Sequence, residues 1–161
     1  MTDRTDLDAR LARLRAVDPR ALGGVHAFDA TLSEVMALDD PRAFAPLTTL
    51  FIQEEGGHEH AMWSLIHAVE HLGAQDGPGG YAAHFLAALP SLCRTAPRWA
   101  AKLLMRTLNS TPYTTALRDR IHAEATPDEM EAITALARSI DRVSPEFHEK
   151  TRQLGLGLTE P

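Results

Sequence analysis

Five times along the chain, a side chain that can cap a helix stands directly before a proline. The pairs are Asp18-Pro19, Asp40-Pro41, Thr111-Pro112, Thr126-Pro127 and Ser144-Pro145. The oxygen of such a side chain accepts a hydrogen bond from a free N–H of the first helical turn, and proline at the first helical position loses no hydrogen bond. Thr126 together with Glu129 also has the spacing of a capping box. The sequence therefore predicts that a helix begins at each of these pairs.

The remaining sequence favours helices over strands. Alternating β-branched runs are missing, and alanine and leucine dominate. We expect an all-α fold, an irregular array of about seven to nine short helices that resembles an α-solenoid or an orthogonal bundle. We expect one domain over residues 1–161, with N-terminal helices over about 1–40, a central helical array over 41–143, and a short helix and tail over 144–161.

Apolar residues at helical spacing locate the individual helices. The expected ranges are about 3–17, 25–38, 58–72, 81–92, 97–110, 112–125 and 127–143, with another helix opening at Asp40-Pro41 and a short last one from Pro145. The clearest predicted break is Gly73 to Gly80, which holds four glycines and a proline. Pro90 is expected to end or kink its helix, and Thr95 is expected to cap the next.

The composition is that of an ordinary globular protein, with 44% hydrophobic and 24% charged residues. No apolar run reaches the roughly 18 residues of a membrane span, and the N-terminus lacks the pattern of a signal peptide. The single Cys93 cannot form an internal disulfide and suggests a reducing compartment. We therefore expect a cytoplasmic protein with no membrane contact.

The segment Gly57 to Leu72 predicts a helix with three different surfaces. Its apolar face is made of Ala61, Met62, Leu65, Ile66, Ala68, Val69 and Leu72. The opposite side carries a histidine stripe of His60, His67 and His71. Between the two lies Trp63 with Glu59 and Glu70. An aromatic side chain surrounded by carboxylates is suited to contact a basic protein surface.

Two short motifs could indicate a metal site. His67-Ala-Val-Glu70-His71 matches the H-x-x-E-H pattern of inverted zinc peptidases, but Glu70 projects about 100° from the line of the two histidines. Those peptidases also need a much larger fold, so a solvated histidine face is the preferred interpretation. Glu55-x-x-His58 resembles half of a di-iron motif, yet the chain has no second copy and Gly56-Gly57 would break the helix.

Charge is distributed unevenly along the chain, whose net charge is −6. No Lys or Arg occurs from Ala43 through Cys93, where the acidic residues are Glu54, Glu55, Glu59, Glu70 and Asp76. The next segment is basic, and Arg98, Lys102 and Arg106 recur there every four residues. This basic ridge could pair with acidic neighbours or grip a phosphate. The net charge argues against a general nucleic-acid binder.

Two successive segments, HAMWSLIHAVEH at 60–71 and LAALPSLCRTAPRWAAKLLMRTLNS at 86–110, resemble known sequences. They are similar to the helical immunity proteins of bacterial contact-dependent inhibition and other polymorphic-toxin systems. The matching positions are Trp63, His67 and Glu70, then Pro97, Trp99, Arg106, Asn109 and Ser110. The resemblance covers roughly residues 54–125.

The resemblance implies a small antitoxin that binds one cognate toxin domain and blocks it without catalysing a reaction. We expect no catalytic residue, no cofactor, no metal and no direct nucleic-acid contact. A toxin of the nuclease type would often be basic, because it binds nucleic acid. We therefore predict that the acidic segment forms the toxin-binding surface, which consists of Glu54, Glu55, Glu59, Trp63 and Glu70.

Two other classes of function remain open on the sequence alone. One is a metal-dependent helical enzyme that uses His60, His67 or His71. The other is a helical scaffold module that binds a peptide or nucleic acid along the basic ridge.

Overall fold

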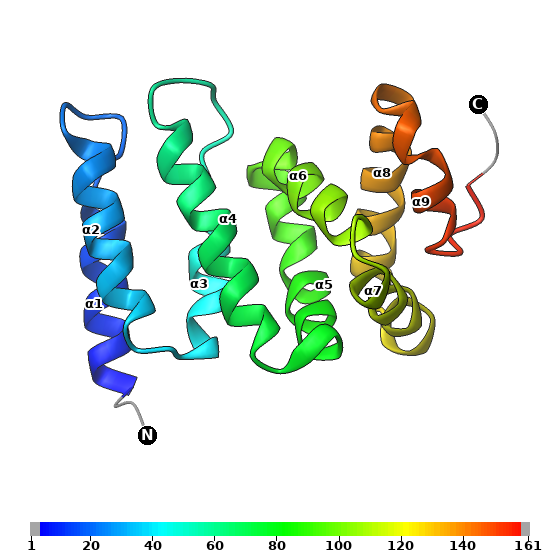
Figure 1. Cartoon of the computed structure of the whole chain (residues 1–161), viewed down its shortest axis with the longest axis horizontal. Helices are drawn as coiled ribbons and strands as arrows, with labels where there is room; N and C mark the ends of the chain where they lie inside the picture. Colours follow the sequence, from blue (N-terminus) through cyan, green and yellow to red (C-terminus); the bar gives the residue numbers. More distant parts are fainter. Residues whose placement is uncertain (1–3, 159–161) are drawn as a thin grey trace. The chain divides into compact units, whose positions relative to one another are not determined.

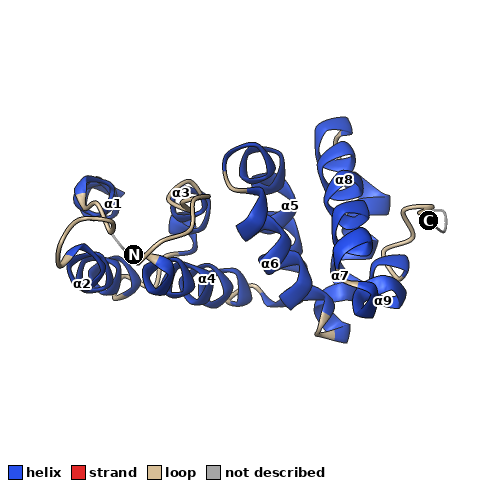
Figure 2. Cartoon of the chain, turned by 90° about the horizontal axis from the view of Figure 1, so that it is seen from above, coloured by secondary structure: helices blue, strands red, loops and turns tan. Residues whose placement is uncertain are grey.

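The structure is a computed structural model and describes residues 4–158. Within that range every regular element is helical, and no strand occurs (Figures 1 and 2). The elements are α1 (Arg4–Ala16), α2 (Gly24–Met36), η1 (Pro41–Ala43), α3 (Phe44–Thr48), α4 (Glu59–Ala74), α5 (Gly77–Thr95), α6 (Pro97–Leu108), α7 (Thr111–Glu124), α8 (Pro127–Val143), η2 (Pro145–Phe147) and α9 (His148–Arg152), where η marks a 3₁₀ helix. The predicted all-α class is therefore confirmed.

The chain divides into two compact units, Met1–Gln75 and Asp76–Pro161. The predicted single domain over 1–161 stays a prediction. In the first unit, α2 packs against both α1 and α4, and α4 also packs against α3. Figure 2 shows α1 and α3 in one layer and α2 and α4 in the other. The helices that carry the predicted site residues therefore belong to this unit.

The core of the first unit is built from several helices and confirms the apolar face predicted for α4. The fully or almost fully buried side chains include Leu7, Leu11, Leu14, Phe28, Leu32, Val35, Phe44 and Leu47. Helix α4 adds its whole predicted face, which is Ala61, Met62, Leu65, Ile66, Ala68, Val69 and Leu72. Each large aliphatic side chain removed from water contributes about 1.5–3 kcal/mol to stability. Packing therefore fixes which side of α4 remains accessible.

In the second unit, α5 packs against α6, α7 and α8, and α8 also contacts η2 and α9. Trp99 is completely buried in the core of this unit. Tyr81 stacks on Phe85 at 5.9 Å between ring centroids and meets Tyr113 edge-on at 5.3 Å. The Tyr81 hydroxyl lies 3.2 Å from the hydroxyl of Thr107, which satisfies a polar group inside the core.

Only some of the cap–proline pairs begin a helix in the predicted manner. Thr126 accepts a hydrogen bond from the Glu129 N–H, and the Glu129 carboxylate accepts one from the Thr126 N–H, so the capping box is confirmed. Asp40 accepts a hydrogen bond from the Arg42 N–H and opens η1, which continues into the short α3. Ser144 precedes η2. At Thr111 the prediction is wrong by one residue, because the cap position is Ser110.

Asp18-Pro19 does not begin a helix, so that prediction was wrong. The Asp18 carboxylate instead accepts hydrogen bonds from the backbone N–H and the side chain of Arg20, which closes a local turn. Helix α2 begins later, after Gly23 in the left-handed conformation with φ 72°. An Asp side chain can cap a helix or close a turn. Here Gly23 and Gly24, which lie shortly after Asp18, favour the turn.

The break predicted between helices at Gly73 to Gly80 was too long. Gly73 lies inside α4, and Gly77 to Gly80 form the first turn of α5, so only Gln75 and Asp76 separate the two helices. A Cβ atom at Gly80 would lie 2.3 Å from Asp76 Cβ, so the absence of a side chain there allows the tight entry. Gly80 therefore permits the tight first turn of α5.

Pro90 does not end its helix, because α5 continues to Thr95. Proline removes one backbone hydrogen bond, and the buried Leu89 and Leu92 on either side of it supply the packing that holds the helix together. The prediction that Thr95 caps α6 was wrong. Its hydroxyl donates to the Ser91 carbonyl oxygen, and Ala96 occupies the cap position.

Candidate functional site

All five residues of the predicted toxin-binding surface lie in the first unit, but they fall into two groups. Glu54 and Glu55 are exposed in the loop between α3 and α4. Glu59, Trp63 and Glu70 are half-buried on α4. Their spacing of four and seven residues places these three on one stripe along the helix. A partner can therefore reach the two loop carboxylates completely and the α4 stripe only in part.

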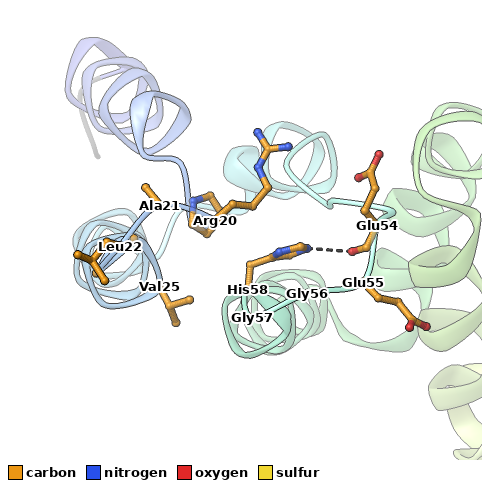
Figure 3. Close-up of a pocket in the computed structure, with 12 residues that line it drawn as sticks. Arg20, Ala21, Leu22, Val25, Glu54, Glu55, Gly56, Gly57 and His58 are labelled. Carbon is orange, nitrogen blue, oxygen red and sulfur yellow. Dashed lines mark hydrogen bonds between the residues drawn. The ribbon is translucent and has the colours of Figure 1, made fainter.

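The exposed acidic loop forms one wall of a groove of about 680 Å³ (Figure 3). The opposite wall is the turn that joins α1 to α2. The groove is lined by residues 19–25 and 54–58. In Figure 3, the side chain of Leu22 points away from His58, while Glu54 and Glu55 lie across the groove from it and turn their carboxyl groups to opposite sides of the loop. The acidic side chains of the groove therefore come from the α3–α4 loop alone.

His58 holds the acidic loop in place. The residue is 4% exposed, and its Nε2 lies 2.9 Å from the carbonyl oxygen of Glu54 (Figure 3). Because a carbonyl oxygen can only accept, Nε2 must carry the proton and donate it. His58 is also the residue that precedes α4. One buried side chain thus connects the start of the helix to the position of the loop.

Arg20 is the single Lys or Arg among the described residues that line the groove. Its Nε donates to Asp18 Oδ1 at 2.9 Å, and this side-chain hydrogen bond holds the pKa of Asp18 below its usual value. The same pairing with Asp18 raises the pKa of Arg20, and the charge of Glu54 adds to that effect. Asp18 therefore neutralises the positive charge of Arg20. The charges of Glu54 and Glu55 remain, so the groove has a net negative charge.

The histidine stripe pairs mainly with carboxylates of other segments. His60 Nε2 lies 3.5 Å from Asp29 Oδ2, and His71 Nε2 lies 3.0 Å from Asp39 Oδ1. His67 Nδ1 lies 3.9 Å from Glu70 Oε2 on the same helix. Between residues 4 and 158 no three His, Cys, Asp or Glu side chains come together as a metal site would need. The two histidines of the H-x-x-E-H pattern thus contact different carboxylates, His67 that of Glu70 and His71 that of Asp39.

The basic ridge lies in the second unit, where two of its cations cover an aromatic ring. The Arg98 guanidinium carbon lies 5.0 Å from the centroid of Trp99, and Lys102 Nζ lies 5.7 Å from it. Such cation–π contacts orient both side chains over the indole. This arrangement was missed from the sequence, although Arg98 and Lys102 flank Trp99 along the helix.

Cys93 is half-buried in α5. Burial raises the pKa of its thiol to about 11. The thiol is therefore protonated near neutral pH, and a protonated thiol is a poor nucleophile. Cys93 therefore behaves as a small apolar side chain of α5.

Sequence reasoning identified the acidic wall of the groove but missed the opposite wall. Leu22 is fully exposed on the α1–α2 turn. The only local signal is Gly23-Gly24, which is typical of a break between two helices. Nothing in the sequence indicated that this turn lies beside a loop thirty residues further along the chain.

A family model described as Immunity protein 30 matches residues 20–117. No curated protein and no solved structure matches the chain. In the part of the chain that the structure describes, no helix is long and apolar enough to cross a membrane.

The matched residues begin earlier than the resemblance noted in the sequence, and they include both walls of the groove, all of α4 and the basic ridge. Immunity proteins of polymorphic toxin systems neutralise a cognate toxin, so the predicted binding role and the predicted lack of enzymatic activity are both confirmed. Because the match covers more than half of the chain, the protein belongs to the immunity protein 30 family.

Proposed function

We propose that this protein protects its cell by binding a basic toxin domain of the nuclease type and blocking the active site of that domain. The contact surface is the acidic segment of the first unit, with Glu54, Glu55, Glu59, Trp63 and Glu70. We place the complex in the cytoplasm and assign the pair to a contact-dependent inhibition system.

The observation that carries this proposal is the charge of one uninterrupted stretch. No Lys or Arg occurs between Ala43 and Cys93, and within that stretch the consecutive residues Glu54 and Glu55 are both exposed. Basic side chains around a nuclease active site bind phosphates, so an acidic surface can occupy the same site. Complementary charge also raises the rate at which the two proteins meet.

Trp63 supplies the second part of the surface. It is half-buried on α4, between Glu59 one turn before it and Glu70 two turns after it. Aromatic side chains that become fully desolvated at an interface often contribute most of the binding energy, while surrounding charges set specificity. We assign the loop carboxylates to rapid association and Trp63 to slow dissociation.

The test begins with the toxin domain encoded beside this gene. That domain, carrying an inactivating substitution, is co-expressed with the full chain, and binding kinetics are measured at two salt concentrations. Wild-type protein should bind it and should inhibit the active form on DNA or RNA at equal concentration. A toxin that is inhibited but cleaves neither nucleic acid would contradict the nuclease assignment.

Charge reversal tests the surface itself. Because Glu54 and Glu55 are exposed, Glu54→Lys with Glu55→Lys should leave the fold intact, slow association by about tenfold at low salt and weaken its salt dependence. The matched control is Glu131→Lys with Glu146→Lys, which changes the net charge equally at exposed positions of the second unit. Equal effects of the two pairs would show that only net charge matters and that the loop is not the contact.

A further inference from the structure

We infer that Glu55 is the loop carboxylate that binds a lysine or arginine of the toxin directly, while Arg20 keeps Glu54 from forming such a contact. Glu54 then contributes only to the long-range attraction between the two proteins. This inference rests on the proposed function, because the cation belongs to the toxin. It adds a direct contact to the association role that the proposed function gives to both glutamates, and it names the residue that determines specificity in the acidic loop.

The two glutamate side chains leave the loop in opposite directions. Glu54 and Glu55 are consecutive and exposed, and Figure 3 shows their carboxyl groups on opposite sides of the loop. The backbone at Glu54 is fixed, because its carbonyl oxygen accepts a hydrogen bond from His58 Nε2 at 2.9 Å. One toxin side chain therefore reaches one of the two carboxylates and not both.

Arg20 lies on the side of the loop to which Glu54 turns (Figure 3). Its position is defined by Asp18, whose Oδ1 accepts hydrogen bonds from Arg20 Nε at 2.9 Å and from the Arg20 backbone N–H at 3.0 Å. The side-chain hydrogen bond to Asp18 is the main cause of the raised pKa of Arg20. The charge of Glu54 adds to that effect, and the charge of Glu55 does not. The guanidinium is therefore close enough to Glu54 for the two charges to interact.

Arg20 acts differently on a toxin cation at long range and at contact distance. At long range Asp18 balances Arg20, so an approaching basic protein experiences the negative charge of both glutamates. At contact distance a cation that approaches Glu54 also meets the guanidinium of Arg20, and the like charges repel each other. Such repulsion at an interface excludes a contact even where the net charge is favourable.

No cation of the groove restrains Glu55 in this way. Arg20 is the single Lys or Arg among the described residues that line the groove, and it lies on the other side of the loop. Within residues 4–158, the Glu55 side chain takes part in no hydrogen bond or ion pair. Its carboxylate can accept charged hydrogen bonds from a lysine or arginine without losing an existing contact. Glu55 is therefore the carboxylate that is available to the toxin.

The experiment measures binding kinetics of the full chain with the inactivated toxin domain encoded beside the gene. Glu54→Gln and Glu55→Gln form a matched pair, because each removes one charge and keeps the shape of an exposed side chain. Both should slow association to a similar extent, by about two- to threefold at low salt. Only Glu55→Gln should also raise the dissociation rate, by about tenfold, whereas Glu54→Gln should change that rate by less than about twofold.

Arg20→Gln tests why Glu54 makes no direct contact. The backbone N–H of Arg20 can still donate to Asp18 in this variant, and thermal melting checks that the turn is intact. Because the toxin surface is basic, one of its cations can approach Glu54 once the guanidinium is gone. In the Arg20→Gln background, Glu54→Gln should therefore raise the dissociation rate by about threefold or more. An effect of Glu54→Gln that is the same in both backgrounds would overturn the role of Arg20.

Charge exchange then identifies the toxin residue. Each surface lysine or arginine of the toxin is changed to Glu in turn. The variant that has lost the partner of Glu55 should bind the wild type more weakly and should regain binding to Glu55→Lys but not to Glu54→Lys. Equal dissociation rates for Glu54→Gln and Glu55→Gln would overturn the assignment to Glu55 and leave the proposed function standing. Failure of the wild type to bind the toxin would overturn the proposed function itself.

Discussion

The imidazole of His58 donates from Nε2 to the carbonyl oxygen of Glu54 at 2.9 Å, although His58 is buried and Glu54 is exposed. This hydrogen bond ties the acidic loop to the first residue before α4. The hydrogen bond therefore fixes the backbone of the loop at Glu54, while the two carboxylate side chains extend into solvent. Such preorganisation lowers the entropy lost on binding.

Removing that hydrogen bond should loosen the loop without unfolding the protein. His58→Phe keeps a ring of similar size but has no donor, so we expect a loss of about 0.5–1.5 kcal/mol in the free energy of unfolding. Amide hydrogen exchange over residues 53–57 should also become faster. His67→Phe, at an exposed position of α4, is the control. Unchanged exchange in His58→Phe would mean that the hydrogen bond does not order the loop.

The packing of α4 can be tested at Leu65, which is completely buried. Leu65→Ala should lower the free energy of unfolding by about 2–5 kcal/mol, through lost burial and the cavity left behind. Chemical denaturation gives this value. His67→Ala on the same helix changes helix propensity but no core contact, and it should cost well under 1 kcal/mol. A loss below about 1 kcal/mol for Leu65→Ala would mean that the buried face of α4 has been assigned incorrectly.

Asp40 should make stability depend on pH in the acidic range. Its carboxylate is nearly buried and accepts hydrogen bonds from the side chain and backbone N–H of Arg42, which hold its pKa below the usual value. A lowered pKa in the folded state stabilises the protein above the unfolded value, about 3.9, and this stabilisation disappears as the pH falls through the folded value. Wild type should therefore exceed Asp40→Asn in stability by at most about 1 kcal/mol at pH 7, because Arg42 is half-exposed.

Thermal melting between pH 7 and pH 2.5 checks this expectation. The difference between wild type and Asp40→Asn should stay constant above about pH 5 and shrink below about pH 4. A difference that grows as the pH falls would have the wrong sign and would contradict the assignment.

Trp63 should control how long the complex with the toxin persists. If the indole is a desolvated anchor, Trp63→Ala should lower the free-energy barrier to dissociation by about 2 kcal/mol. The dissociation rate should then rise roughly thirtyfold, with little change in the association rate. Trp63→Phe keeps an aromatic ring and should have a smaller effect. Because Trp63 is half-buried, thermal melting of each variant must accompany the kinetics. An unchanged dissociation rate in a folded Trp63→Ala protein would remove it from the contact surface.

Local signals in the sequence predicted much of the fold. The range 127–143 was predicted correctly at both ends, since Thr126 and Glu129 complete a motif that needs only neighbouring residues. Asp18-Pro19 and the glycines before α5 misled the prediction, because the same residues serve turns, caps and close approaches between helices. Pro90 misled it for another reason. The packing of Leu89 and Leu92 is tertiary and outweighs the local cost of the proline.

The candidate site was predictable only on its acidic side. The segment without Lys or Arg can be read directly from the linear sequence, so Glu54 and Glu55 could be predicted from it. Leu22 reaches the same groove only because α2 packs against α4, and no periodicity of the sequence encodes that neighbourhood. Burial of half the Trp63 ring is likewise a property of the packed unit.

The close approach of Gly24 to the Asp18 carbonyl has a consequence for how this protein could change partners. The glycine fixes the shape of the turn, while the side chain at position 22 touches solvent and contributes little to folding. The same division holds on the other wall, where buried His58 sets the path of the loop and exposed Glu55 does not. In the proposed complex, the side chains that contact the toxin are therefore not the residues that fix the loop. We expect that substitutions at 54 and 55 can then match new toxin variants with little change in stability, so mutually exclusive pairs can diverge on one scaffold.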